Sequence, residues 1–315
     1  MKTKKVYLEY LEEFKSFGIS KKEIEELKEQ GIVADIRFHK ELYENKSSSR
    51  PTVGFLLGQD KGDNGEEYYT IGLTYAQAAL STGAEIKFLD YDSTYQQMKG
   101  CDGVILPGGA FDNPEDFFID GKDMGSKEGK RFFAYKAAID EAHRNQKPML
   151  GICAGAQMIG ALLGNMKMYR SIEKEVSKKT VHKPKAETDV RIHGLKLIKG
   201  TPIYDIMGLA SDEDKIMINS RHNQAMVHPA LQDYAEGTPL VKMDMYAVSD
   251  ADGIPEIWGN EATGILCVQG HPEDLAAGGN KKMQRLYDYI ARKAAAYKRA
   301  HTKTQLRVKK STNEM

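Results

Sequence analysis

Cys153 is the residue in this sequence best placed to do chemistry. It lies in Gly151-Ile-Cys-Ala-Gly155, between a short apolar segment (residues 149–152) and a segment of helical character (residues 154–163). A Gly-x-Cys-x-Gly pattern between strand and helix is the cysteine counterpart of the nucleophile elbow, a tight turn that exposes the nucleophile at the carboxyl edge of a sheet. The helix N-terminus favours the reactive thiolate. The alternative is a buried cysteine in a glycine-rich turn.

A cysteine nucleophile needs a base and a group that orients the base, and His271 and Glu273 are predicted to fill these roles. Among the eight histidines, His271 stands out because it follows an apolar strand-like segment, residues 265–268, and precedes a stiffening proline. Glu273, two residues on, could hold the far nitrogen of the imidazole. His-Pro-Glu alone would also fit a surface turn, so the prediction depends on the elbow at Cys153.

The chemistry also needs two backbone amides to bind the developing oxyanion. The amide of Ala154, directly after the nucleophile, is one natural donor. The second is predicted at Gly109, because Pro107-Gly-Gly109 follows a short apolar segment and glycine lets a loop amide turn inward. An ordinary tight turn is the alternative for this loop.

The elements that must position these residues alternate between strand-like and helix-like patterns. Strands are expected at residues 53–57, 86–89, 103–106 and from 148, and helices at 69–80, 132–143 and 154–163. This order predicts an α/β fold of flavodoxin-like type, with three layers and a mostly parallel central sheet. Ligands gather at the carboxyl ends of such strands, where both Gly109 and Cys153 fall.

After Gly164 the sequence becomes more polar and charged, and its apolar segments become shorter. The shorter segments 215–218, 240–248, 254–258 and 264–269 are expected to extend the sheet as antiparallel or mixed strands, and residues 280–297 to form a closing helix. Three regions are therefore predicted: an N-terminal helical extension (1–50), a main domain (51–297) and a basic, frayed C-terminal tail (298–315). The extension reads as a helical hairpin that could support a homo-oligomer, bind a protein partner or merely pack on the main domain.

Composition excludes several classes of function. The chain of 315 residues has 45 basic and 45 acidic side chains, a formal net charge of +0 and no apolar run of membrane-spanning length. Neither a nucleic-acid partner nor a membrane is therefore expected. Three cysteines without CxxC spacing suggest no disulfide framework and no structural zinc, so a reducing, cytoplasmic setting is predicted. We expect no metal and no cofactor.

Four motifs in order carry a family resemblance, over roughly residues 51–292. The chain resembles the class I glutamine amidotransferase superfamily, and within it the peptidase C26 branch of γ-glutamyl-γ-aminobutyrate hydrolase-like proteins. The motifs are Leu106-Pro-Gly-Gly109, Gly151-Ile-Cys-Ala-Gly-Ala-Gln157, Asn219-Ser-Arg-His-Asn-Gln224 and Val268-Gln-Gly-His-Pro-Glu273.

The resemblance implies the same triad and adds a pocket for the α-amino and α-carboxylate groups of a glutamyl substrate. The residues implied to bind that substrate are Gln157, Ser220, Arg221 and His222. A Ser-x-His segment favours a hydrolase over an ammonia-supplying glutaminase. Ala154 and Asn223 stand where family members often carry a basic residue and a second histidine, and residues 110–117 also depart from the family pattern. Because of these departures, the sequence does not predict which amine is released.

The sequence therefore predicts a cysteine hydrolase that cleaves a small-molecule γ-glutamyl amide through a thioester. One alternative is a glutaminase that passes ammonia to a separate synthase. Another is a non-catalytic binding or regulatory protein on the same fold, with the N-terminal hairpin as its interface. A deglycase-like cysteine protein of related architecture is opposed by the His-Pro-Glu segment.

Overall fold

The computed structural model describes residues 50–61, 67–109, 113–121, 129–178, 182, 191–231 and 238–313. The predicted helical hairpin, within residues 1–50, lies almost entirely outside the described residues. The first described strand, β1 (Thr52–Leu56), directly follows Pro51.

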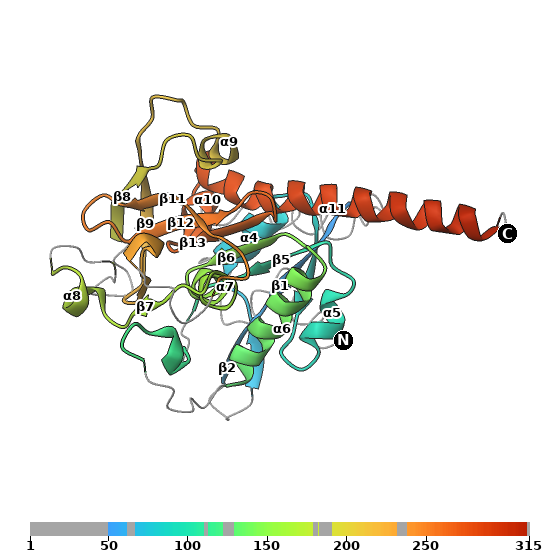
Figure 1. Ribbon diagram of the computed structural model, residues 1–315, viewed down its shortest axis with the longest axis horizontal. Coiled ribbons are helices and arrows are strands. Elements are labelled where there is room, and N and C mark those ends of the chain that lie inside the picture. Colours follow the sequence, from blue (N-terminus) through green and yellow to red (C-terminus); the bar gives the residue numbers. More distant parts are fainter. Residues whose placement is uncertain are drawn as a thin grey trace, which may run out of the picture.

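A nine-stranded sheet in the order β4-β1-β5-β6-β13-β12-β11-β8-β9 organises the described chain (Figure 1). Its first five strands run parallel: β4 (Glu85–Leu89), β1, β5 (Gly103–Leu106), β6 (Met149–Ile152) and β13 (Ile265–Val268). The other four run antiparallel to their neighbours: β12 (Pro255–Asn260), β11 (Asp244–Ser249), β8 (Arg191–Leu197) and β9 (Lys215–Ser220). The predicted extension of a parallel sheet by antiparallel strands is confirmed.

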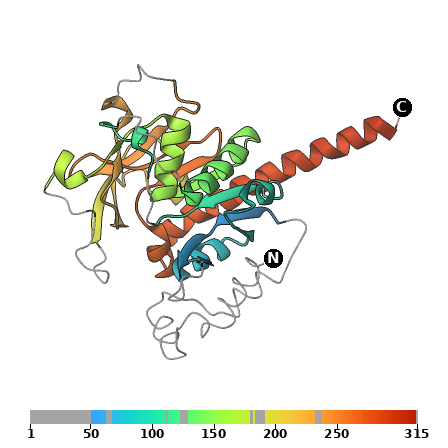
Figure 2. The same cartoon turned by 90° about the horizontal axis from the view of Figure 1, so that it is seen from below.

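Helices cover both faces of this sheet and make the three layers that the alternating pattern predicts (Figures 1 and 2). One face carries α5 (Thr94–Met98), α6 (Lys130–Arg144) and α7 (Ala154–Gly164). The opposite face carries α4 (Leu73–Leu80), α9 (Ile203–Met207), α10 (Pro272–Ala277) and α11 (Lys281–Asn313). The architecture is a flavodoxin-like three-layer fold.

Two hydrophobic cores lie on the two sides of the sheet because successive strand residues point to opposite faces. In β1, Val53 and Phe55 join the core under α4 and α11, whereas Leu56 joins the core under α6 and α7. Strands buried on both faces require the near-continuous apolar runs by which they were predicted.

Smaller elements surround the main sheet, and two of them differ from the sequence-based expectation. β2 (Gly58–Lys61) and β3 (Glu67–Thr70) pair antiparallel, and the sequence analysis predicted neither strand. The helix predicted from Tyr69 therefore begins only at Leu73, since Tyr69 pairs with Gln59 across β2 and β3. The remaining short elements are β7 (Met168–Tyr169) paired with β10 (Ala225–Met226), α8 (Ile172–Glu175) and 3₁₀ turns at Glu115–Phe117 and Pro229–Leu231.

The expectation of a frayed tail from residue 298 was wrong. Helix α11 continues to Asn313 and extends beyond the body of the domain (Figure 1). The physical reason is that no glycine or proline occurs between residues 281 and 313, so nothing in the chain interrupts the helical hydrogen bonds. The basic and polar composition of the tail suggested fraying, but the absence of helix-breaking residues is the stronger determinant of its structure.

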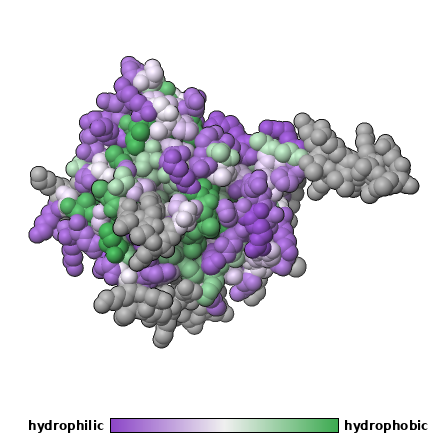
Figure 3. Space-filling view, in the orientation of Figure 1, coloured by the Kyte–Doolittle hydropathy of each residue, from purple (hydrophilic) through white to green (hydrophobic). Residues whose placement is uncertain are grey.

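The face shown in Figure 3 is largely hydrophilic, with hydrophobic side chains in smaller groups. Most large apolar side chains of the described residues lie in the two cores. Within the described part of the chain, no helix combines the length and the apolar character needed to cross a bilayer.

The buried face of helix α11 packs against the sheet and stabilises the domain. Its contribution can be tested at Leu286, which is fully buried. Leu286→Ala should lower the free energy of unfolding by about 3 kcal/mol, because it removes buried methyl groups and leaves a cavity. Urea denaturation followed by circular dichroism measures the loss. Leu240→Ala, at a leucine that is 68% exposed, is the matched control and should change stability by less than about 0.5 kcal/mol. Equal effects of the two substitutions would contradict the packing assignment.

Candidate functional site

Cys153 occupies a tight turn between β6 and α7. Its backbone has φ 49° and ψ −110°, which a residue with a side chain rarely adopts, and it is the N-cap residue of α7. The two glycines of the motif permit this turn. A Cβ on Gly155 would lie 2.0 Å from the carbonyl oxygen of Leu106, and one on Gly151 would lie 2.8 Å from the Cα of Ala156. The structure therefore has the geometry that the Gly-x-Cys-x-Gly pattern predicts.

The loop Pro107-Gly-Gly109 lies beside this turn at the end of β5. A Cβ on Gly108 would come within 2.9 Å of the Cβ of Cys153, so only glycine allows the approach. Gly109 has φ 131°, again a backbone that favours glycine. The predicted oxyanion donors, Gly109 and Ala154, both line the same pocket as Cys153.

Side chains from two helices fix this loop. The hydroxyl of Tyr75, in α4, accepts a hydrogen bond from the amide of Gly108 at 2.9 Å. From α6, Arg131 donates to the carbonyl of Gly108 at 2.9 Å, and Tyr135 donates to the carbonyl of Pro107 at 2.7 Å. Because Gly108 has both backbone groups satisfied, the loop is held in one conformation.

His271 and Glu273 meet next to the cysteine. His271 lies between the end of β13 and the start of α10, and its Nδ1 is 2.6 Å from Oε1 of Glu273. The amide of His271 donates to the carbonyl of Asn219, in β9, at 3.2 Å. The hydroxyl of Tyr75 lies 3.4 Å from Nδ1 of His271. Both triad candidates are buried, with 7% of His271 and 1% of Glu273 exposed.

The electrostatics of this pair favour a protonated imidazole. Burial lowers the pKa of His271, but the negative charges of Glu273 and of the Cys153 thiolate raise it more, and the net pKa lies well above its usual range. Burial, followed by the charge of Glu273, raises the pKa of Tyr75 well above normal, so its hydroxyl stays neutral. The arrangement can therefore hold a thiolate beside an imidazolium.

A pocket of about 690 Å³ opens above these groups. Besides the pair of His271 and Glu273, its walls hold an ion pair in which a guanidinium nitrogen of Arg221 lies 2.9 Å from the carboxylate of Asp274. The residues that line it are Gly72, Thr74, Tyr75, Gly108, Gly109, Cys153, Ala154, Gln157, Arg221, His222, Asn223, Gln224, His271, Glu273 and Asp274. Three segments far apart in the sequence thus meet at the carboxyl ends of β5, β6 and β13.

Three of the four residues predicted to bind substrate line this pocket. Arg221 is partly exposed to it, and Gln157 contributes a side-chain amide that donates to the carbonyl of Gln224 at 3.2 Å. His222 is buried and only borders the cavity. Ser220 does not line the pocket, because it points into the protein and donates its hydroxyl to the carbonyl of His182 at 2.7 Å. The geometry therefore gives no support for Ser220 as a substrate ligand.

Sequence reasoning missed Tyr75, Arg131 and Asp274. Tyr75 and Arg131 lie on helices far from the motifs, and no local pattern distinguishes them from other helical residues. Asp274 follows Glu273 directly and accepts hydrogen bonds from Thr74 and Asn219, both at 2.9 Å. Its position next to Glu273 was the only sequence feature that could have indicated a role for Asp274 in the site. Of the described residues, those that could hold a metal lie in a separate buried group around Glu256.

Two solved structures share the fold of this chain. A candidate GMP synthase protein from Thermoplasma acidophilum is 16% identical, with a TM-score of 0.51 over 80% of this chain and 98% of that chain. The glutaminase domain of Trypanosoma brucei CTPS with bound acivicin is 18% identical, with a TM-score of 0.50 over 78% and 94%. At these identities the likeness concerns the fold.

The chain belongs to the peptidase C26 family, whose model matches residues 59–273. The candidate glutamine amidotransferase-like protein YvdE of Lactococcus lactis is 25% identical over 55% of this chain, and protein NtpR of Enterococcus hirae is 25% identical over 49%. The chain spans 66% and 58% of the lengths of these two relatives, less than two thirds of either.

The geometry of the elbow predicts that alanine substitutions at two glycines of α7 differ strongly in their effect on stability. Gly155→Ala should lower the free energy of unfolding by about 3 kcal/mol or more, because its Cβ would overlap the Leu106 carbonyl. Gly160→Ala is the control, since there the new Cβ meets the flexible end of Met226 at 3.0 Å and alanine favours the helix. Urea denaturation of both variants measures the difference. A Gly155→Ala protein as stable as Gly160→Ala would refute the close approach at the elbow.

Proposed function

We propose that this protein hydrolyses γ-glutamyl amide bonds with Cys153 as nucleophile, His271 as acid and base, and Glu273 as the residue that orients His271. The observation that carries the proposal is the convergence of an elbow cysteine and a carboxylate-bound histidine on one pocket. Membership of the peptidase C26 family supports the reaction class.

In the proposed reaction the Cys153 thiolate attacks the γ-carbonyl carbon of the substrate. The resulting oxyanion accepts hydrogen bonds from the amides of Ala154 and Gly109, which border the pocket next to the sulfur. The His271 imidazolium then gives its proton to the leaving amine as the C–N bond breaks, and a thioester forms. Neutral His271 takes a proton from water, the hydroxide attacks the thioester, and glutamate leaves as the thiolate is restored.

The ion pair in the pocket wall suggests how the glutamyl group is recognised. An α-amino acid carries one ammonium and one carboxylate, and outside the triad the pocket is lined by the cation Arg221 and the anion Asp274. Arg221 can bind a carboxylate with two parallel hydrogen bonds. Asp274, whose side chain is 18% exposed, is the matching partner for the ammonium. Gln157 and Gln224 also line the pocket, and the side-chain amide of Gln157 donates to the carbonyl of Gln224.

Substitution of the nucleophile tests the chemistry. Cys153→Ala should reduce glutamate release from γ-glutamyl amides at least about a thousand-fold, because no other group can form the thioester. Glutamate is measured in a coupled assay over a panel of γ-glutamyl amines, γ-glutamyl peptides and free glutamine. Cys101→Ala is the matched control, because burial raises the pKa of Cys101 to about 11 and the thiol stays protonated. Turnover that survives in Cys153→Ala would reject the mechanism.

The same panel separates the hydrolase from its alternatives. Release from γ-glutamyl amines but not from glutamine supports the proposal. Activity on glutamine alone would instead identify a glutaminase that supplies ammonia to a synthase. No release from any compound, with the fold intact by circular dichroism, would point to a binding or regulatory protein.

The role of Glu273 predicts a change in pH dependence. Because the charge of Glu273 helps to raise the pKa of His271, Glu273→Gln should lower that pKa. The imidazolium that protonates the leaving amine is lost as pH rises through the His271 pKa, so this loss should begin at lower pH in the variant. The alkaline limb of kcat/KM for glutamate release, measured against pH, reports this loss. Glu261→Gln, at a surface carboxylate, is the control, and an unchanged Glu273→Gln profile would contradict the orienting role.

A further inference from the structure

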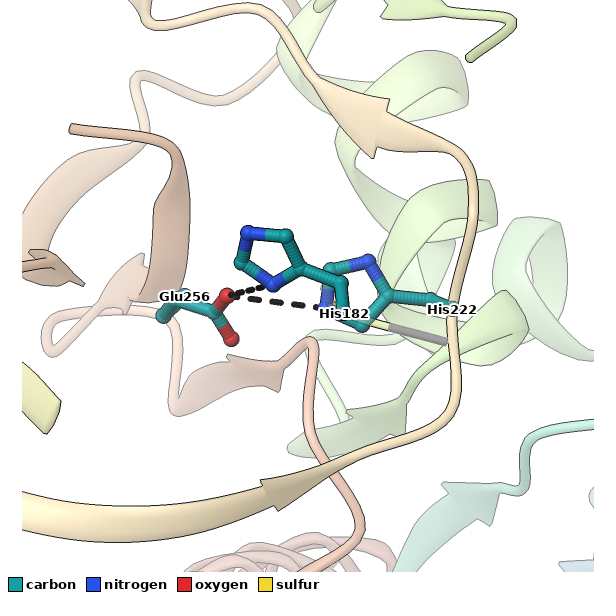
Figure 4. Close-up of side chains that lie close together, drawn as sticks. All are labelled: His182, His222 and Glu256. Atoms are coloured by element: carbon teal, nitrogen blue, oxygen red, sulfur yellow. Dashed lines mark ion pairs between the residues drawn. The ribbon is translucent and has the colours of Figure 1, made fainter. Parts of the chain in front are cut away.

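Outside the triad, three buried side chains converge on one point in the described part of the chain. They are His182, in the segment between α8 and β8, His222, which follows β9, and Glu256 in β12. Figure 4 shows both imidazole rings directed at the carboxylate of Glu256. No more than 4% of any of these residues is exposed. The triad mechanism uses none of them as an acid, base or nucleophile.

The distances within this group suit a small cation. Nδ1 of His182 and Nε2 of His222 each lie 3.5 Å from Oε1 of Glu256. Bonds of 2.0–2.2 Å in a tetrahedron place neighbouring ligand atoms roughly 3.3–3.6 Å apart. One ligand atom from each of the three residues lies within 4.8 Å of the others.

The hydrogen bonds around the two histidines determine which nitrogen of each ring carries the proton. Nδ1 of His222 is 2.9 Å from the carbonyl oxygen of Gln224, which can only accept, so Nδ1 is the donor. Nε2 of His182 is 3.0 Å from the carboxylate of Asp252, so Nε2 is the donor there. In the neutral rings, the nitrogens that face Glu256 are therefore the ones with a free lone pair.

Two lone pairs thus point at a negatively charged oxygen in the protein interior. Oε1 of Glu256 also lies 3.1 Å from Nε2 of His193. Nδ1 of His182, Nε2 of His222 and Oε2 of Glu256 are all buried without a hydrogen-bond partner in the structure. Such a set of acceptors is unfavourable unless a cation lies between them.

We propose that His182 Nδ1, His222 Nε2 and the Glu256 carboxylate bind a divalent transition-metal ion, with Zn²⁺ as the best match. Two imidazoles and a carboxylate are a donor set that zinc accepts at these separations. Asp252 and the Gln224 carbonyl take the outer hydrogen bonds that metal-binding histidines usually make. This proposal departs from the metal-free expectation, which was based on cysteine spacing and could not detect a site built from histidines far apart in the sequence.

The position of the site suggests a structural role for the metal. His222 belongs to the segment that forms one wall of the pocket, next to Arg221. The ion would connect this wall to Glu256 in β12 and to His182. Its binding is expected to stabilise the folded protein by mass action, independently of the reaction at Cys153.

Zinc titration of the full chain tests the site. After treatment with a chelator, the protein should take up one Zn²⁺ per chain by isothermal titration calorimetry, and its melting temperature should rise. Cys153→Ala should behave in the same way, which excludes uptake by the Cys153 thiolate and His271. Loss of the tight site in Cys153→Ala, or no uptake below about 1 µM by the wild type, would overturn the proposal.

Two variants locate the bound ion. His182→Gln should weaken zinc binding at least about 100-fold, and Asp252→Asn, which alters the outer hydrogen bond, should weaken it about 10-fold to 100-fold. His301→Gln, at an exposed histidine on α11, is the control and should bind as the wild type does. Circular dichroism checks the fold of each variant. If His182→Gln does not fold, Asp252→Asn decides the question, and wild-type affinity in a folded His182→Gln or in Asp252→Asn would refute the site.

Discussion

The site depends on a steric constraint at the turn between β6 and α7, where Cys153 has a positive φ and Gly155 packs against the carbonyl of Leu106. A residue with a side chain in this backbone conformation is maintained only if the surroundings determine it. Here β6 is held between β5 and β13, and α7 packs on the same sheet, so both ends of the turn are fixed. The same packing brings Leu106, and with it the loop at Gly109, next to the cysteine.

The remaining groups of the pocket follow from the order of strands in the sheet. Since β5, β6 and β13 are adjacent and parallel, their carboxyl ends bring Gly109, Cys153 and His271 to one edge. Strand β9, the last of the antiparallel strands in the sheet order, also ends near this edge. There the carbonyl of Asn219 accepts a hydrogen bond from the amide of His271. Arg221 therefore reaches the pocket from the far end of the sheet order and pairs with Asp274.

Two kinds of buried charge occur near each other in this fold. At the triad, Glu273 is paired with an imidazole whose pKa it raises, and the pair faces a pocket. Around Glu256, two imidazoles present lone pairs to a carboxylate in a closed interior. The first arrangement suits proton transfer and the second suits a bound cation. His222, which borders both, connects the pocket wall to the group around Glu256.

Local sequence patterns alone indicated the parallel strands, the elbow, and the candidates Cys153, His271 and Glu273. These features depend on short-range properties: apolar runs, glycines needed at a tight turn, and a proline after the histidine. Gln157 and Arg221 came from the family resemblance, and both line the pocket. Tertiary structure alone decided that Ser220 points away from the pocket, that Tyr75 and Arg131 hold the Gly108 loop, and that His182, His222 and Glu256 meet. No local pattern could show these contacts, because each joins residues more than twenty positions apart and arises only when the sheet and its covering helices have packed.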